Sequence, residues 1–136
     1  MEESTLKYWK DAGHVARRTL EAMKLELTPG KTFHEVIEAA ERYIHRHGGK
    51  PAFPGTIAVN DLAAHFTTDH AINQVEGWDG EMVLQKGDCV KIDFGVHIKG
   101  HIADNALTFE IGNGNEHTEQ IKAAKEARDA AIEMMH

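Results

Sequence analysis

The sequence predicts an α+β fold, in which helices pack on one face of an antiparallel sheet. Residues 4–25 and 33–44 carry apolar side chains every three or four positions, which is the period of an amphipathic helix. Residues 88–96 and 101–111 instead alternate apolar and polar side chains, as half-buried strands do. A third helix is predicted from Glu116 to the end, where Ala, Glu and Lys are frequent.

The helices have recognisable ends. Thr28-Pro29-Gly30 stops the first one. Thr32 and Glu35 then form a capping-box pattern that opens the second, and Gly48-Gly49 closes it. The apolar positions predicted for the inner face of the second helix are Phe33, Val36, Ile37, Ala40 and Ile44.

The middle of the chain is less regular. Short strands are expected at 57–59 and 82–84, with a long surface loop at 69–79. Asn113-Gly114-Asn115 reads as the turn before the last helix.

Composition limits the function classes. The 136 residues form one domain, residues 1–136, long enough to bury a core. A net charge of −7 argues against nucleic-acid binding. The single Cys89 fits a reducing cytoplasm, no apolar run approaches the roughly 18 residues of a membrane span, and the N-terminus lacks signal-peptide order.

Two aspartates stand out in the predicted hairpin. The alternation turns Asp93 and Asp104 away from the core, and a four-residue loop at 97–100 pairs them directly, with Cα atoms roughly 4.5–5.5 Å apart. Two carboxylates this close either share a proton or bind a divalent cation. The alternative is a solvated face that tolerates the repulsion, and the pattern alone leaves both open.

Two stretches carry a resemblance to a known family: PAFPGTIAVNDLAAHFT (51–67) and GDCVKIDFGVHIKGHIADNALT (87–108). Together, and in this order after two helices, they resemble the type II methionine aminopeptidases of the pita-bread (creatinase/aminopeptidase-like) metallopeptidase fold. The resemblance spans nearly the whole chain but only the first half of a normal family member.

The resemblance implies a function and a site. The reaction is metal-dependent hydrolytic removal of the N-terminal methionine of nascent polypeptides. Asp93 and Asp104 match metal ligands for two divalent ions (Mn, Co, Fe or Zn), with Asp104 bridging them. His65 matches the active-site histidine beside the scissile bond, and Phe53 matches the wall of the methionine pocket. An ordinary loop histidine and a plain core aromatic are the alternatives for these last two.

The match also has departures. Family members complete the site with a histidine and two glutamates from later in the chain, whereas this sequence ends at His136. His101 stands where the family has an aromatic residue, and the segment 68–80 is longer and lacks the usual proline.

Three readings follow from these departures. The chain is half of an enzyme with a complementary C-terminal half, a half domain that pairs with itself as a homodimer, or a non-catalytic binding module. The facing aspartates argue against the third. For a self-pairing half domain, association is expected across the face that carries Asp93 and Asp104, beside Ile102 and Ala106.

Overall fold

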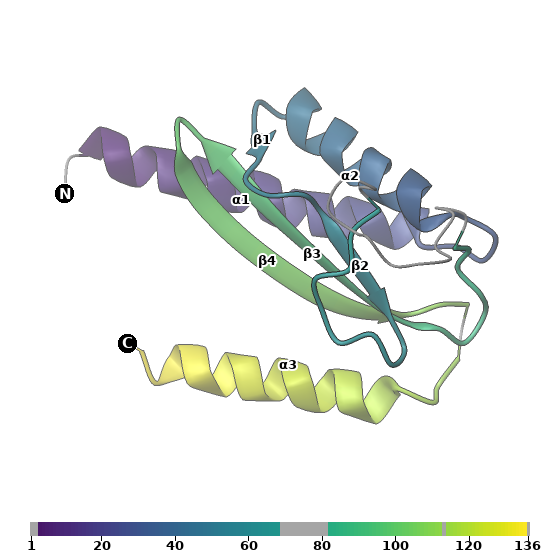
Figure 1. Ribbon diagram of the computed structural model, residues 1–136. Helices are drawn as coiled ribbons and strands as arrows, with labels where there is room; N and C mark the ends of the chain where they lie inside the picture. Colours follow the sequence, from purple (N-terminus) through teal and green to yellow (C-terminus); the bar gives the residue numbers. More distant parts are fainter. Residues whose placement is uncertain (1–2, 69–81, 113, 136) are drawn as a thin grey trace.

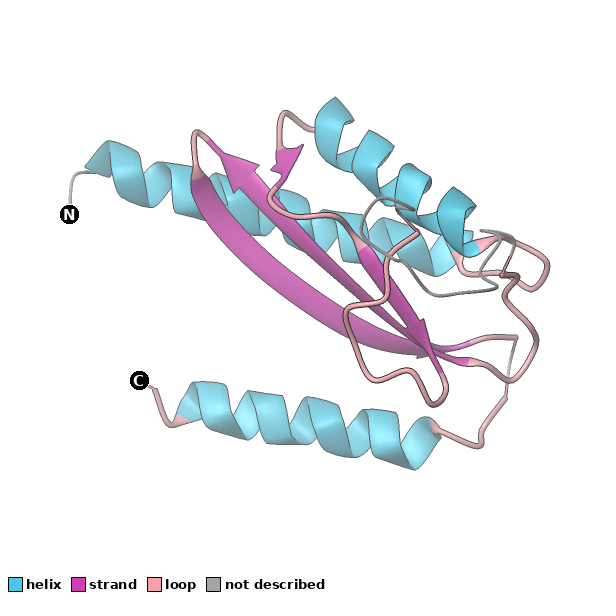
Figure 2. Ribbon diagram, viewed as in Figure 1, coloured by secondary structure: helices cyan, strands magenta, loops and turns pink. Residues whose placement is uncertain are grey.

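The computed structural model describes residues 3–68, 82–112 and 114–135 (Figures 1 and 2). The predicted loop at 69–79 and Asn113 of the predicted turn lie outside these residues. The predicted class, helices with an antiparallel sheet, is confirmed. The elements run in the order α1 (Glu3–Glu26), α2 (Phe33–Arg46), β1 (Lys50–Pro51), β2 (Thr56–Val59), β3 (Cys89–Ile98), β4 (His101–Glu110) and α3 (Thr118–Glu133). None of the helices within the described residues combines the length and apolarity needed to cross a membrane.

Strand β3 is the centre of the sheet. It pairs antiparallel with β4 along its whole length, and on its other side with β1 and then β2. β1 was not predicted, because two residues that include a proline carry no strand pattern. The strand predicted at 82–84 is wrong: Val83 forms only an isolated bridge to Thr32.

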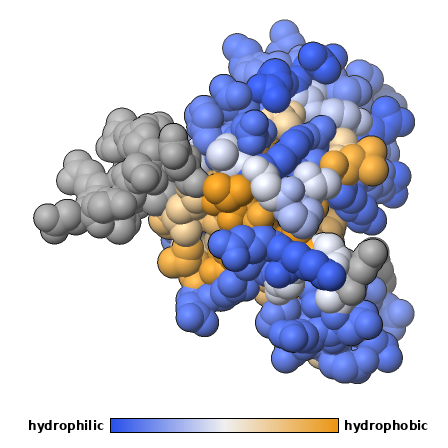
Figure 3. Space-filling model, turned by 90° about the vertical axis from the view of Figure 1, so that its right-hand side faces the viewer, coloured by the Kyte–Doolittle hydropathy of each residue, from blue (hydrophilic) through white to orange (hydrophobic). Residues whose placement is uncertain are grey.

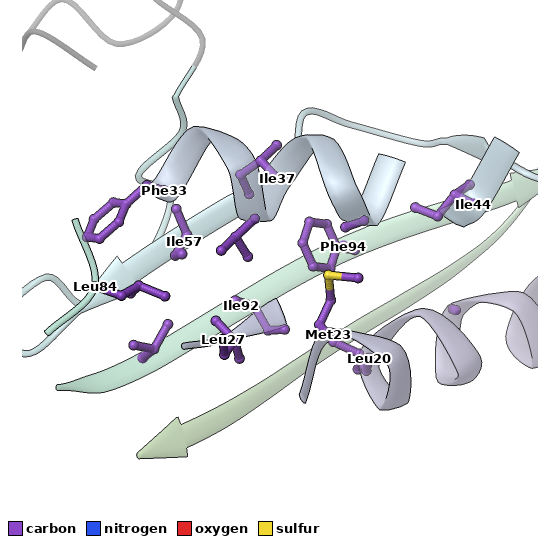
Figure 4. Close-up of a cluster of buried hydrophobic side chains, with 14 of the residues drawn as sticks. Leu20, Met23, Leu27, Phe33, Ile37, Ile44, Ile57, Leu84, Ile92 and Phe94 are labelled. Atoms are coloured by element: carbon purple, nitrogen blue, oxygen red, sulfur yellow. The ribbon is translucent and has the colours of Figure 1, made fainter. Parts of the chain in front are cut away.

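Helices α1 and α2 cover one face of the sheet, which we call the core face (Figure 1). All five residues predicted for the inner face of α2 are buried, and the capping box of Thr32 and Glu35 is present. The core between helices and sheet includes Leu20, Met23, Leu27, Phe33, Ile37, Ile44, Ile57, Leu84, Ile92 and Phe94 (Figure 4). The helical period of 3.6 residues and the strand period of two residues therefore place the apolar side chains in one layer.

Helix α3 does not join that layer. The sequence predicted all helices on one face, but α3 lies across the opposite face, which we call the outer face, where its Ile121 and Ala124 line a cleft together with Ala58 and Ala106 of the sheet. No residue of α3 is buried. The longer apolar side chains of α1 and α2 already cover the core face, so the alanine-rich α3 cannot pack on that face.

Candidate metal centre

The turn between β3 and β4 sets the register of the site. Asp93 pairs with Ala106 and Gly95 with Asp104, so the predicted direct pairing of Asp93 with Asp104 is wrong by two residues. The reason is that β3 continues to Ile98, and Lys99 and Gly100 alone form the turn, with φ of 53° and 82°. Two-residue turns with positive φ at both positions match the twist of the flanking strands, which favours them over longer loops.

The two-residue shift leaves both aspartates on the outer face. Side chains alternate with a period of two, so only an odd shift would have moved one of them into the core. Asp93 and Asp104 are diagonal neighbours on adjacent strands, an arrangement with Cα atoms roughly 7–8 Å apart. Asp104 is still near enough to help raise the pKa of Asp93.

The environment of the pair is asymmetric. Asp104 is exposed, whereas Asp93 is half-buried, and its Oδ1 is fully buried with no hydrogen-bond partner. Burial, and then the charge and hydrogen bond of Asp104, raise the pKa of Asp93 above its ordinary value, while His65 acts in the opposite direction. The negative charge of ionised Asp93 is therefore partly buried, with no hydrogen bond at Oδ1 to offset the lost hydration. A bound cation would supply that favourable interaction.

His65 belongs to the loop that follows β2. The first residue of this loop, Asn60, is tied to the start of β3: its side chain donates to Asp88 over 3.0 Å and accepts from the backbone N–H of Cys89 over 2.9 Å. His65 itself is exposed and has a φ of 62°. Histidine is one of the few residue types enriched in this left-handed region, and residues held there cluster at functional sites. The loop brings the imidazole into electrostatic range of Asp93.

Phe53 packs on the outer face against Gly95. A Cβ atom placed on Gly95 would lie 2.6 Å from Cδ1 and 2.9 Å from Cζ of the Phe53 ring, so only glycine leaves room for it. Because Gly95 is the strand partner of Asp104, the ring lies next to the aspartate pair. All four residues singled out in the sequence thus belong to one side of the sheet.

The donor set fits a divalent cation in part. Two carboxylates on adjacent strands offer hard oxygen ligands, and the orphaned Oδ1 of Asp93 gains a partner when a cation binds. Within residues 3–68, 82–112 and 114–135, no three His, Cys, Asp or Glu side chains gather closely enough to enclose an ion. The pair is therefore an incomplete ligand set.

Helix α3 adds residues that the sequence analysis did not single out. Ile121, Ala124, Lys125 and Arg128 line a cleft of about 270 Å³ whose wall includes Asp93. Their spacing of i, i+3, i+4 and i+7 puts them on one side of the helix, a signal that was available in the sequence. Hydrophobic surface gathers across the middle of the face seen in Figure 3, with hydrophilic surface above and below it.

Comparison with known proteins relates this chain to one family. A sequence profile of metallopeptidase family M24 matches residues 7–136. The chain is 39% identical to a methionine aminopeptidase of Thermococcus onnurineus and 37% identical to one of Archaeoglobus fulgidus, over 91% and 99% of its own length. It spans only 39% and 43% of those relatives.

Solved structures show the same fold. The crystal structure of a methionine aminopeptidase from Thermotoga maritima superimposes with a TM-score of 0.84 at 24% identity, covering 98% of this chain and 53% of that one. A prolidase from Pyrococcus horikoshii OT3 gives a TM-score of 0.77 at 27% identity, covering 96% of this chain and 36% of that one. The described fold therefore corresponds to about a third to a half of these larger proteins.

Proposed function

Because this chain belongs to metallopeptidase family M24, we propose that it supplies half of the active site of a methionine aminopeptidase, which removes the N-terminal methionine from nascent polypeptides. The relatives from Thermococcus onnurineus and Archaeoglobus fulgidus, which carry that name, are similar to this chain over 91% and 99% of its length. The observation that carries the proposal is the Asp93–Asp104 pair, with its orphaned buried oxygen, on the face that α1 and α2 leave open. The single cysteine fits a cytoplasmic location.

In this proposal Asp93 and Asp104 hold divalent ions, two when the site is complete, of the kind that accept both oxygen and nitrogen ligands: Mn, Co, Fe or Zn. Such ions polarise a carbonyl group and lower the pKa of bound water. His65 donates a hydrogen bond to the carbonyl oxygen of the substrate, on which negative charge develops. Phe53 packs against the methionine side chain.

The remaining ligands must come from another polypeptide segment. The chain spans about two fifths of the relatives it matches, and two carboxylates leave most coordination positions of an ion to solvent. The partner is either a complementary C-terminal half or a second copy of this chain.

Metal titration tests the proposed ligands. We expect the isolated chain to bind Mn²⁺ weakly and Ca²⁺ more weakly still, because a rigid pair of carboxylates provides fewer oxygens than calcium prefers. Asp93→Asn and Asp104→Asn should each abolish the calorimetric signal. Asp11→Asn is the matched control, because Asp11 lies on the exposed side of α1 and pairs with Lys7. Unchanged titrations for both site variants would rule out the ligand assignment.

Complementation tests the activity. The chain alone should release no free methionine from a methionyl peptide, since its ligand set is incomplete. Adding the C-terminal half of the Thermococcus onnurineus relative should restore release, and Asp104→Asn should remove it again. Full activity of the isolated monomer would contradict the half-site argument.

A further inference from the structure

We propose that Asn60 is a positioning residue for His65: it holds residues 60–65, which we call the His65 loop, against the start of β3 and so keeps the imidazole near Asp93. This inference deepens the proposed function and rests on it for the role of His65, but not for the way in which the loop is held. The evidence is that each polar group of Asn60 is bonded to one short segment, residues 88–91.

The hydrogen bonds of Asn60 all reach the same strand. Its backbone N–H donates to the carbonyl of Cys89 over 2.9 Å, and its backbone carbonyl accepts from Nζ of Lys91 over 3.0 Å. Its side chain accepts from the N–H of Cys89 over 2.9 Å and donates to Oδ1 of Asp88 over 3.0 Å. Lys91 lies two positions before Asp93 in β3, so the loop is fixed to the strand that carries this aspartate.

The Asp88 partner is itself fixed. Its second carboxylate oxygen accepts from the N–H of Gln85 over 2.8 Å, and its backbone carbonyl accepts from the N–H of Ile111 over 2.9 Å. The side chain of Asp88 therefore joins the His65 loop to the turn before β3, while its backbone joins that turn to the segment after β4. A loop bonded to this residue is held relative to the whole hairpin.

The other end of the His65 loop returns to β2. The N–H of Ile57 donates to the carbonyl of Phe66 over 2.8 Å, and the Phe66 ring meets the ring of Phe33 edge-on, with centroids 6.2 Å apart. Figure 1 shows the chain turning back from the end of β2 to run beside it. His65 is thus held between two anchors, Asn60 before it and Phe66 directly after it.

The backbone of His65 explains why both anchors are needed. Its φ of 62° lies in the left-handed region, where a residue other than glycine persists only if the surrounding structure fixes it. Phe66 fixes one side of His65. Releasing Asn60 frees the other side, so His65 can relax to a right-handed or extended conformation that turns the imidazole away from Asp93. Residues 63–64, which line the cleft together with Asp93, would move with it.

An exchange of two residues tests the bond between loop and strand. Asn60→Asp sets a second carboxylate against that of Asp88, which replaces a hydrogen bond with repulsion. In the double variant Asn60→Asp/Asp88→Asn the roles are reversed: the amide at position 88 donates to the carboxylate at position 60, and its oxygen still accepts from the N–H of Gln85. Asn60→Gly removes the side chain without adding charge, and glycine adopts the φ of 51° found at this position.

NMR relaxation of the backbone amides, measured on the metal-free chain, shows whether the loop is held. Order parameters at residues 63–65 should be about 0.85 in the wild type and fall below about 0.6 in Asn60→Asp and in Asn60→Gly. The double variant should recover the wild-type values. Amides of β3 and β4 should stay rigid throughout, which shows that each variant folds. Unchanged order parameters in both single variants, or a double variant as mobile as Asn60→Asp, would overturn the proposal.

Kinetics separates positioning from a general loss of stability. In the chain complemented with the C-terminal half of the Thermococcus onnurineus relative, Asn60→Asp should lower kcat for methionine release by about tenfold or more, because a misplacement of about 1 Å can cost up to about 10²-fold. In a His65→Ala background the same change should have no further effect, since the group that it displaces is gone. Equal losses in both backgrounds would overturn the proposal. Failure of complementation would count against the proposed function alone, because the relaxation experiment needs neither metal nor substrate.

Discussion

Replacing Gly95 with alanine tests how tightly Phe53 packs beside the aspartate pair. Gly95 is in the middle of β3, and its φ is not in the left-handed region, so alanine adopts the backbone conformation without strain. The obstacle is the Phe53 ring, whose Cδ1 and Cζ would lie 2.6 Å and 2.9 Å from the new Cβ. The ring has to move away for the variant to fold.

The cost follows from these distances. Forcing one methyl group into a packed contact destabilises a protein by about 1–3 kcal/mol. Without an obstacle, glycine to alanine stabilises by about 0.4–1 kcal/mol, because it restricts the unfolded chain. We therefore expect Gly95→Ala to lower the free energy of unfolding by about 1–2 kcal/mol in the wild type. In a Phe53→Ala background the same change should raise it slightly, so the sign reverses between the two backgrounds.

Urea unfolding followed by far-UV circular dichroism measures all four proteins of this cycle. Gly13→Ala is the control, because no atom lies within 4 Å of its added Cβ and a helix interior favours alanine. If Gly95→Ala lowered the free energy of unfolding equally in the wild type and in the Phe53→Ala background, the Phe53 ring would not lie against Gly95. The position assigned to Phe53 would then be wrong.

Two further predictions concern charge and capping. Asp93→Asn should stabilise the metal-free fold at neutral pH, because burial and the Asp104 charge raise the pKa of Asp93. Because the pKa of Asp93 is higher in the native state than in the unfolded state, the native state binds more protons between the two pKa values. The free energy of unfolding of the wild type therefore falls as pH rises from 3.8 through the pKa of native Asp93, and it stays lower above that pKa. The advantage of the variant should therefore vanish in acid, and urea unfolding at both pH values checks it; an equal advantage in acid would contradict the assignment. Thr32→Ala removes the hydroxyl that accepts from the Glu35 N–H over 3.1 Å, and should cost about 1 kcal/mol of unfolding free energy. Thr32→Ser keeps the hydroxyl and serves as its control, and an unaltered Thr32→Ala stability would count against the cap.

The hairpin shows where sequence reasoning succeeded and failed. Alternation placed Asp93 and Asp104 on the same face correctly, because that property depends only on the parity of their positions. The register was wrong, because several turn lengths fit the sequence between the two strands. Lys99 and Gly100 adopt positive φ as a pair, which is decided by the twist of the strands that they join.

Helix α3 shows a second limit. Its helical character was readable from its composition, and its bounds came out at Thr118–Glu133. Its layer was not readable, since an alanine-rich helix matches either face of a sheet about equally well. The helix lies on the outer face, beside Asp93, because α1 and α2 already cover the core face.

The sequence by itself determined the properties that depend on neighbouring positions: two amphipathic helices, the cap at Thr32, two alternating strands, and aspartates directed away from the core. Tertiary structure decided the properties that depend on distant segments. It set the diagonal contact of Asp93 with Asp104, left one oxygen of Asp93 buried without a partner, and brought His65 and Phe53 to the same side of the sheet. Local patterns fix which way a side chain points, whereas burial and electrostatic contact depend on every segment that packs around it.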